Sequence, residues 1–128
     1  MKAPVWIEAR DAIVLYERLL ALFGGAAGRR DPGLLESALS RPRQRLAYAP
    51  ESTVFELAAA YAAGLVGNHP FVDGNKRTAF VAMELFLDLN GWTLVADDAD
   101  CIFTMEAVAA GQITEVDLAV WIRGHLAK

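Results

Sequence analysis

The segment at residues 75–90 is apolar on nearly every side when it is read as a helix. A helix on the surface of a globular protein carries apolar residues on one face only, whereas a helix that is apolar all round must be covered by its neighbours. Glu84 and Asp88 interrupt the segment, and it is too short to span a bilayer. We therefore expect a helical bundle in which this segment runs through the middle.

Five further segments have the apolar spacing that is typical of helices, and none alternates as a strand does. They cover residues 8–23, 32–41 and 53–68, a stretch that opens at Asp97 and another that opens at Thr114, with a short extended piece at residues 92–95. The chain has 128 residues, and Ala and Leu dominate its apolar fraction of 55%. These features predict an all-α fold, a single domain over residues 1–128 that forms a compact bundle of about six helices.

Proline positions suggest where the second of these helices begins and ends. Asp31 suits the N-cap, and Pro32 suits the first helical position. Arg41 precedes Pro42 and predicts the end of the helix, because the residue before a proline is driven out of helical geometry. The basic loop expected from Pro42 to Pro50 is either an ordinary surface connection or a flap that touches a ligand or a protein substrate.

A polar loop leads directly into the apolar central helix. A helix N-terminus is a ready anion site, because its first N–H groups lack intrahelical partners and the helix dipole is positive there. Two cations at this position point to phosphate, and an imidazole and a carboxylate beside them point to chemistry on that phosphate. The residues concerned are His69, Asp73, Gly74, Asn75, Lys76 and Arg77.

Each side chain of the loop suits one part of that chemistry. Arg77 offers a planar fork for phosphate oxygens, and Lys76 offers a compact charge. Asp73 is a hard oxygen ligand suited to Mg²⁺ shared with nucleotide phosphates. Gly74 lets the backbone approach a phosphate closely, and Asn75 can cap the helix, donate to phosphate, or do both. The imidazole can take a proton from a hydroxyl near neutral pH.

Each of these residues also has an ordinary structural explanation when it is taken alone. Residues 73–75 would form a turn, the two cations would form a solvated face, and a histidine before proline would be a packing or surface residue. Phe71 is expected to pack into the core beneath the loop. The occurrence of all of them together, immediately before a buried helix, favours the functional interpretation.

The loop resembles the signature of the Fic/Doc (Fido) family, His-x-Phe-x-Asp/Glu-Gly-Asn-Gly-Arg-x-x-Arg. Lys76 stands at the second glycine and Phe80 at the last arginine. Both departures are similar to the death-on-curing (Doc) toxin branch, whose motif has Asn-Lys-Arg-Thr-Ala, as residues 75–79 do here. Residues 30–42 resemble the N-terminal signature of Doc-like toxins. The positions that match the family signature are His69, Phe71, Asp73, Gly74, Asn75 and Arg77.

This resemblance implies a toxin of a type II toxin–antitoxin system. In typical family members the second glycine makes room for the nucleotide phosphates, and AMP is transferred to a protein hydroxyl. Lys76 would crowd that space and add a charge, so that the γ-phosphate takes the reacting position. The chain is then expected to transfer the γ-phosphate of ATP to a protein hydroxyl, by resemblance a threonine of elongation factor Tu, and so to arrest translation.

The same resemblance assigns a role to each residue of the loop. His69 would be the general base on the acceptor hydroxyl, and Asp73 would hold Mg²⁺ or orient the site. Gly74, Asn75 and Lys76 would bind phosphate oxygens with the helix N-terminus. The third catalytic residue, Arg77, would bind phosphate and neutralise charge that develops on the transferred group.

Two other functions are compatible with the sequence. The chain could be an AMP transferase of the wider family, or an inactive member that acts as an interaction module. The intact His69, Asp73 and Arg77 argue against loss of activity, and Lys76 favours kinase over AMP transfer.

The sequence lacks the complete inhibitory motif that many family members carry, so we expect a separate protein to control its activity. Many family members carry an inhibitory helix of the form Ser/Thr-x-x-x-Glu-Gly/Asn. Ser52 and Glu56 fit its first part, but Leu57 fails the last position. Thr53 and Glu56 are better explained as a capping box at the start of a helix. A cognate Phd-like antitoxin, whose disordered tail folds onto the toxin, is the expected partner.

Composition limits the remaining possibilities. A formal net charge of −4 argues against binding of nucleic acid, which usually requires a basic face. The single cysteine, Cys101, cannot form an internal disulfide and is expected to be a small core residue. We see no signal peptide or membrane segment, and we expect a cytoplasmic protein.

Overall fold

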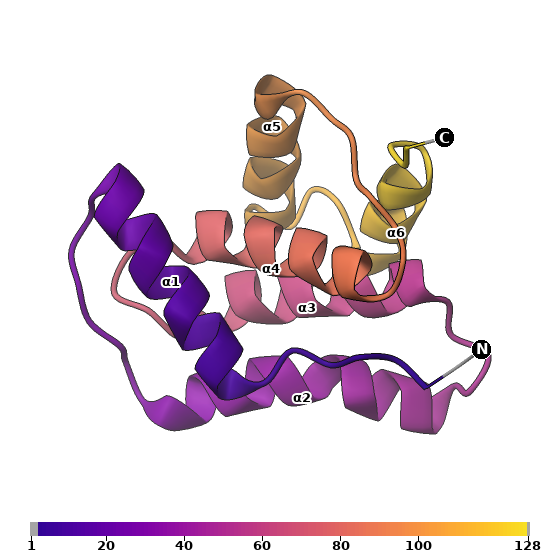
Figure 1. Ribbon diagram of the computed structural model, residues 1–128, viewed down its shortest axis with the longest axis horizontal. Coiled ribbons are helices and arrows are strands. Elements are labelled where there is room, and N and C mark those ends of the chain that lie inside the picture. The colour runs from indigo at the N-terminus through magenta and orange to yellow at the C-terminus, as the bar shows by residue number, and fades with distance from the viewer. Residues whose placement is uncertain (1–2, 128) are drawn as a thin grey trace.

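The computed structural model describes residues 3–127, and the described chain folds into six helices (Figure 1). The all-α expectation is confirmed; pairing of extended backbone in the described residues is limited to two isolated bridges, Arg29 with Phe71 and Leu94 with Leu126. The second bridge joins the extended piece expected at residues 92–95 to the C-terminal segment. The helices are α1 (Ala9–Phe23), α2 (Pro32–Tyr48), α3 (Val54–Asn68), α4 (Asn75–Leu89), α5 (Asp98–Ala109) and α6 (Glu115–Arg123).

Helices α3 and α4 lie side by side in the middle of the bundle, with α2 along the other side of α3 (Figure 1). Helix α1 crosses one end of this layer, α5 stands steeply on α4, and α6 packs on α3. The apolar α4 therefore occupies the middle as its sequence predicts. Helix α3 is nonetheless the more deeply buried of the two, because its alanines let α2, α4 and α6 approach closely.

The helix that was expected to end at Arg41 continues for almost two further turns, so the prediction of a loop from Pro42 to Pro50 is wrong. A proline inside a helix removes one hydrogen bond and costs about 3 kcal/mol. Here the ring of Pro42 is fully buried, and that burial offsets the cost. The carbonyl oxygen of Ala38, which Pro42 cannot bond, lies against Gly64 of α3, where an added Cβ atom would sit 3.0 Å away.

Arginine side chains at the end of α2 form ion pairs with acidic residues, and this segment is helical and does not form a flap. Arg45 contacts Glu56 of α3 at 2.7 Å and Glu115 of α6 at 3.1 Å. Arg41 also contacts Glu115, at 2.7 Å. These cations therefore join α2 to α3 and α6, and they are already paired with protein carboxylates.

Local capping explains where most of the helices begin. Thr53 and Glu56 form the expected capping box on α3, which places the Glu56 carboxylate at the start of that helix. That hydrogen bond from the Thr53 backbone, together with Arg45, lowers the pKa of Glu56 below 4.5. Asp31 and Asp97 cap α2 and α5 with their side chains. No described helix is both long and apolar enough to cross a membrane.

Candidate active site

A cavity of about 360 Å³ opens where the end of α1 faces the loop between α3 and α4. Every residue singled out for the site lines this cavity. The structure adds the end of α1 and one loop residue, none of which the sequence pointed to as part of a site. The lining residues are Phe23, Gly24, Gly25, His69, Val72, Asp73, Gly74, Asn75, Lys76 and Arg77.

The loop keeps its shape through two residues in the left-handed backbone region. His69 ends α3 with φ 50°, and Gly74 begins α4 with φ 82°. The glycine adopts this conformation without steric cost, whereas the histidine is strained. Phe71 anchors the loop from below: it is buried, and its ring stacks on Tyr16 with 3.9 Å between the ring centroids. The expectation that Phe71 packs into the core is confirmed.

The side chain of Asn75 organises the loop from within. Its Oδ1 accepts a hydrogen bond from the Phe71 N–H at 3.0 Å, and its Nδ2 donates to the Phe71 carbonyl at 2.9 Å. This pair of contacts fixes which end of the amide is nitrogen. The same Nδ2 lies 3.2 Å from Nδ1 of His69. Because an amide nitrogen can only donate, Nδ1 accepts in this arrangement, and the neutral ring carries its hydrogen on Nε2.

The segment that follows α1 pairs with the loop and forms the facing wall. The Val72 N–H donates to the Gly28 carbonyl at 2.9 Å, and the Arg30 N–H donates to the Pro70 carbonyl at 2.8 Å. The Arg30 guanidinium donates to the carbonyl oxygen of His69 at 2.9 Å. The backbone of His69 is therefore held from the opposite wall as well as from α3.

Asp73 lies between this wall and the start of α4. Its Oδ1 accepts from the Gly74 N–H at 2.8 Å, and its Oδ2 accepts from the Ala26 N–H at 3.3 Å. A Cβ atom at Gly25 would come within 2.8 Å of that Oδ2, and φ at Gly25 is 121°, a backbone conformation that favours glycine. Residues 3–127 hold no cluster of three metal-ligating side chains. Within this part of the chain Asp73 is the one carboxylate that lines the cavity, and one carboxylate together with phosphate and water is a ligand set typical of Mg²⁺.

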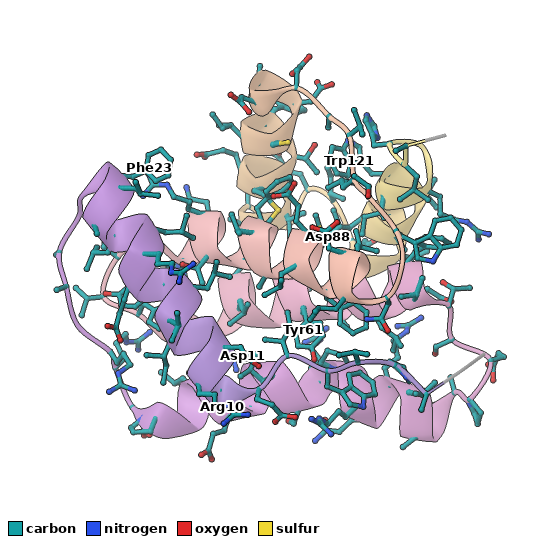
Figure 2. All side chains as sticks on the ribbon, in the orientation of Figure 1. Arg10, Asp11, Phe23, Tyr61, Asp88 and Trp121 are labelled. Carbon is teal, nitrogen blue, oxygen red and sulfur yellow. The ribbon has the colours of Figure 1, made fainter. Side chains whose placement is uncertain are left out.

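Two cations stand at the start of α4 with different supports. Lys76 Nζ contacts Glu106 Oε1 of α5 at 3.1 Å, in a pair that is largely exposed. The Arg77 guanidinium lies over the ring of Phe23, 4.6 Å from its centroid. Figure 2 shows Phe23 at the end of α1 that lies beside the start of α4. The first intrahelical bond of α4 runs from the Thr78 N–H to Gly74, so the preceding N–H groups have no intrahelical acceptor.

Five of the six residues that match the family signature line this one cavity, and the sixth, Phe71, is buried beneath the loop. A model of the Fic/DOC family matches residues 6–87, which span α1 to most of α4. The chain belongs to the Fic/DOC family. The part that the family model matches therefore includes both walls of the cavity described above.

Two relatives place this Fic/DOC chain beside the Doc proteins. It is 32% identical over 117 residues to the protein kinase doc of Escherichia phage P1, a match that covers 91% of this chain and 92% of that protein. It is 46% identical over 77 residues to the toxin Doc of Mycolicibacterium smegmatis, which is 59% of this chain and 58% of that protein. The resemblance to the Doc branch is confirmed, and the two relatives support a Doc-like toxin of the kinase type.

Proposed function

We propose that this protein is a Doc-like toxin that transfers the γ-phosphate of ATP to a hydroxyl of another protein. The observation that carries the proposal is the convergence of an imidazole, a carboxylate, two cations and a helix N-terminus on one cavity. Phosphoryl transfer asks a protein mainly for positioning and charge, and this cavity supplies both. The Doc relatives add support for the kinase type.

The start of α4 is the proposed seat of the triphosphate. The N–H groups of Asn75, Lys76 and Arg77 precede the first intrahelical bond and can donate to phosphate oxygens. In the free protein both donors of the Asn75 side chain are engaged in the loop, so its backbone N–H is the group that is free to meet phosphate first. Gly74 keeps this surface open, and the charges of Lys76 and Arg77 balance the phosphate.

Transfer itself needs one bond to form and one to break. The acceptor oxygen attacks the γ-phosphorus, the bond from that phosphorus to the bridging oxygen breaks, and ADP leaves. His69 takes the proton of the acceptor hydroxyl. To accept it at Nε2, the ring must carry its own hydrogen on Nδ1, so the contact between Asn75 Nδ2 and His69 Nδ1 must open when the substrates bind. Arg77 neutralises charge on the transferred group.

Mg²⁺ is proposed as the companion of ATP, with Asp73 as its protein ligand. Bound there, the ion would neutralise phosphate charge. The Asp73 carboxylate is held by the Gly74 and Ala26 N–H groups, which orient it whether or not a metal is bound.

The target, the controlling partner and the location are proposed on the resemblance to Doc toxins. They are a threonine of elongation factor Tu, a Phd-like antitoxin whose tail folds onto the toxin, and the cytoplasm. Glu56 is used in the capping box and in the ion pair with Arg45, and this fits control from outside the chain.

ATP labelled at either the γ or the α position tests the proposed reaction in a bacterial lysate. We expect γ label, and no α label, to reach one protein band, and that band is then identified by mass spectrometry. His69→Ala should abolish the labelling. His125→Ala is the matched control, since this second histidine stacks on Trp121 outside the cavity. Transfer of α label would show AMP transfer instead, and a fully active His69→Ala would remove the proposed base.

A further inference from the structure

Phe23 is unusually exposed for a large aromatic residue. Its side chain closes α1 and remains 63% exposed, although phenylalanine is among the residues most often buried. One face of the ring nevertheless has a defined neighbour, the Arg77 guanidinium at 4.6 Å from the ring centroid. This exposed ring therefore lies against a cation of the candidate active site.

We propose that Phe23 is a positioning residue that holds the Arg77 guanidinium at the mouth of the cavity for phosphate. This role rests on the proposed function and deepens it. The ring touches no reacting atom and acts through the arginine alone.

The geometry of the pair leaves the arginine free to bind an anion. A guanidinium interacts with an aromatic ring through its planar face, whereas its hydrogen bonds leave along its edge. A carboxylate in the same place would occupy the edge donors and compete with phosphate, as Glu106 does for Lys76. Within the described residues Arg77 has no carboxylate in ion-pair contact. Phe23 can thus restrict this long side chain without using its donors.

The backbone next to Phe23 keeps the ring in place. α1 ends at this residue, and the Gly24 N–H bonds back to Leu20 at 2.8 Å. Gly25 then lies against the Asp73 carboxylate, where an added Cβ atom would be 2.8 Å from Oδ2, and its φ of 121° favours glycine. These contacts place the end of α1 beside the start of α4, which carries Arg77, and so bring the ring and the guanidinium together.

Substitution of the ring tests the role directly. Phe23→Leu should lower the rate of label transfer from γ-labelled ATP by about two- to fivefold, the range expected for loss of an exposed cation–π contact. Phe23→Trp should restore the rate, because indole is the best partner for a cation. Phe103→Leu is the matched control: this phenylalanine of α5 is 72% exposed and does not line the cavity. If Phe23 had only a structural role, Phe23→Leu would lower the thermal stability of the protein. We expect the thermal stability of this variant to equal that of the parent.

A spectroscopic measurement separates this inference from the proposed function. In the free protein the NMR signals of the Arg77 side chain should be shifted by the ring current of Phe23, and Phe23→Leu should abolish the shift whereas Phe103→Leu should not. Unshifted Arg77 signals in the parent protein would overturn the positioning role. So would equal transfer rates for the parent and Phe23→Leu. A parent protein that transfers no label, yet shows the shift, would instead overturn the proposed function and leave Phe23 without a reaction to serve.

Discussion

Two residues in the first turn of α4 contribute very differently to the stability of the fold. Asn75 is buried, and its amide makes three contacts that hold Phe71 and His69. Arg77, two positions further on, is exposed, and its guanidinium lies over the ring of Phe23 without an ion pair to any described carboxylate. The family signature treats the two alike, but the structure predicts that their substitutions have different consequences.

For Arg77→Ala we expect transfer activity to disappear while the free energy of unfolding changes by less than about 0.5 kcal/mol, as for most exposed positions. Asn75→Ala should by contrast destabilise the protein by about 1–3 kcal/mol, because it leaves the Phe71 N–H and carbonyl buried without a partner. Urea unfolding and label transfer, measured on the same preparations, check both. A large loss of stability in Arg77→Ala would make that residue structural.

His69 should change its tautomer when nucleotide binds. In the free protein the Asn75 contact places the hydrogen of the neutral ring on Nε2, whereas proton acceptance at that nitrogen requires the hydrogen on Nδ1. Nitrogen-15 NMR distinguishes the two forms, with a non-hydrolysable ATP analogue as the ligand. Hydrogen on Nε2 in both states would argue against His69 as the base.

The ionised carboxylate of Glu84 should lower the free energy of unfolding at neutral pH. Burial, and then the repulsion of Asp88, raise the pKa of its carboxyl above 4.5. The folded protein therefore holds this proton more tightly than the unfolded chain, and the free energy of unfolding falls as the pH rises from 4.5 through the raised pKa. Glu84→Gln removes that loss and should stabilise the protein by roughly 0.5 kcal/mol at neutral pH.

The gain from Glu84→Gln should shrink to nothing below pH 4.5, where the carboxyl is protonated in both states. Asp88→Asn should give a smaller gain, since it relieves only the second cause. Denaturant unfolding across this pH range measures both variants. A variant that is less stable than the parent at neutral pH would contradict the assignment. Burial, and then the carboxylates of Glu84, Asp98, Asp97 and Asp100, raise the pKa of the Cys101 thiol. This thiol is only partly buried, so Cys101 is not the core residue that its sequence suggested.

At the scale of elements, helix starts could be predicted from sequence and one helix end could not. Asp31, Thr53, Asp97 and Thr114 all cap helices as expected, because capping depends on a few adjacent residues. The same reasoning from adjacent residues predicts that α2 ends before Pro42, and that prediction is wrong. The burial of Pro42 and the approach of Gly64 to Ala38 are tertiary facts, and they outweigh the local penalty.

Two glycines of α3 provide a matched test of that helix contact. A Cβ atom at Gly64 would lie 3.0 Å from the Ala38 carbonyl oxygen and 3.3 Å from Ala38 Cα, which are backbone atoms that cannot move cheaply. Gly64→Ala should therefore destabilise the protein by about 1–3 kcal/mol. Gly67 has nothing within 4 Å, so Gly67→Ala should stabilise it by about 0.4–1 kcal/mol. Equal effects of the two variants in urea unfolding would contradict the close α2–α3 contact.

At the scale of the whole molecule, the site needs walls from distant parts of the sequence. The six candidate site residues could be found because they fall within nine consecutive positions, 69–77, where an apolar helix begins. Phe23 and Gly25 could not, since only the fold brings the end of α1 to Asp73 and Arg77. A glycine pair after an exposed aromatic residue was the one local sign, and it is equally typical of an ordinary helix end.

The proposed reaction depends on which phosphorus of ATP this cavity presents to the acceptor. The most direct measurement is the intact mass of purified elongation factor Tu after incubation with this protein, ATP and Mg²⁺. We predict a gain of one phosphate group, which is absent when His69→Ala replaces the parent protein. A gain of AMP, or no change of mass in the presence of the active parent, would contradict the proposed reaction or its proposed target.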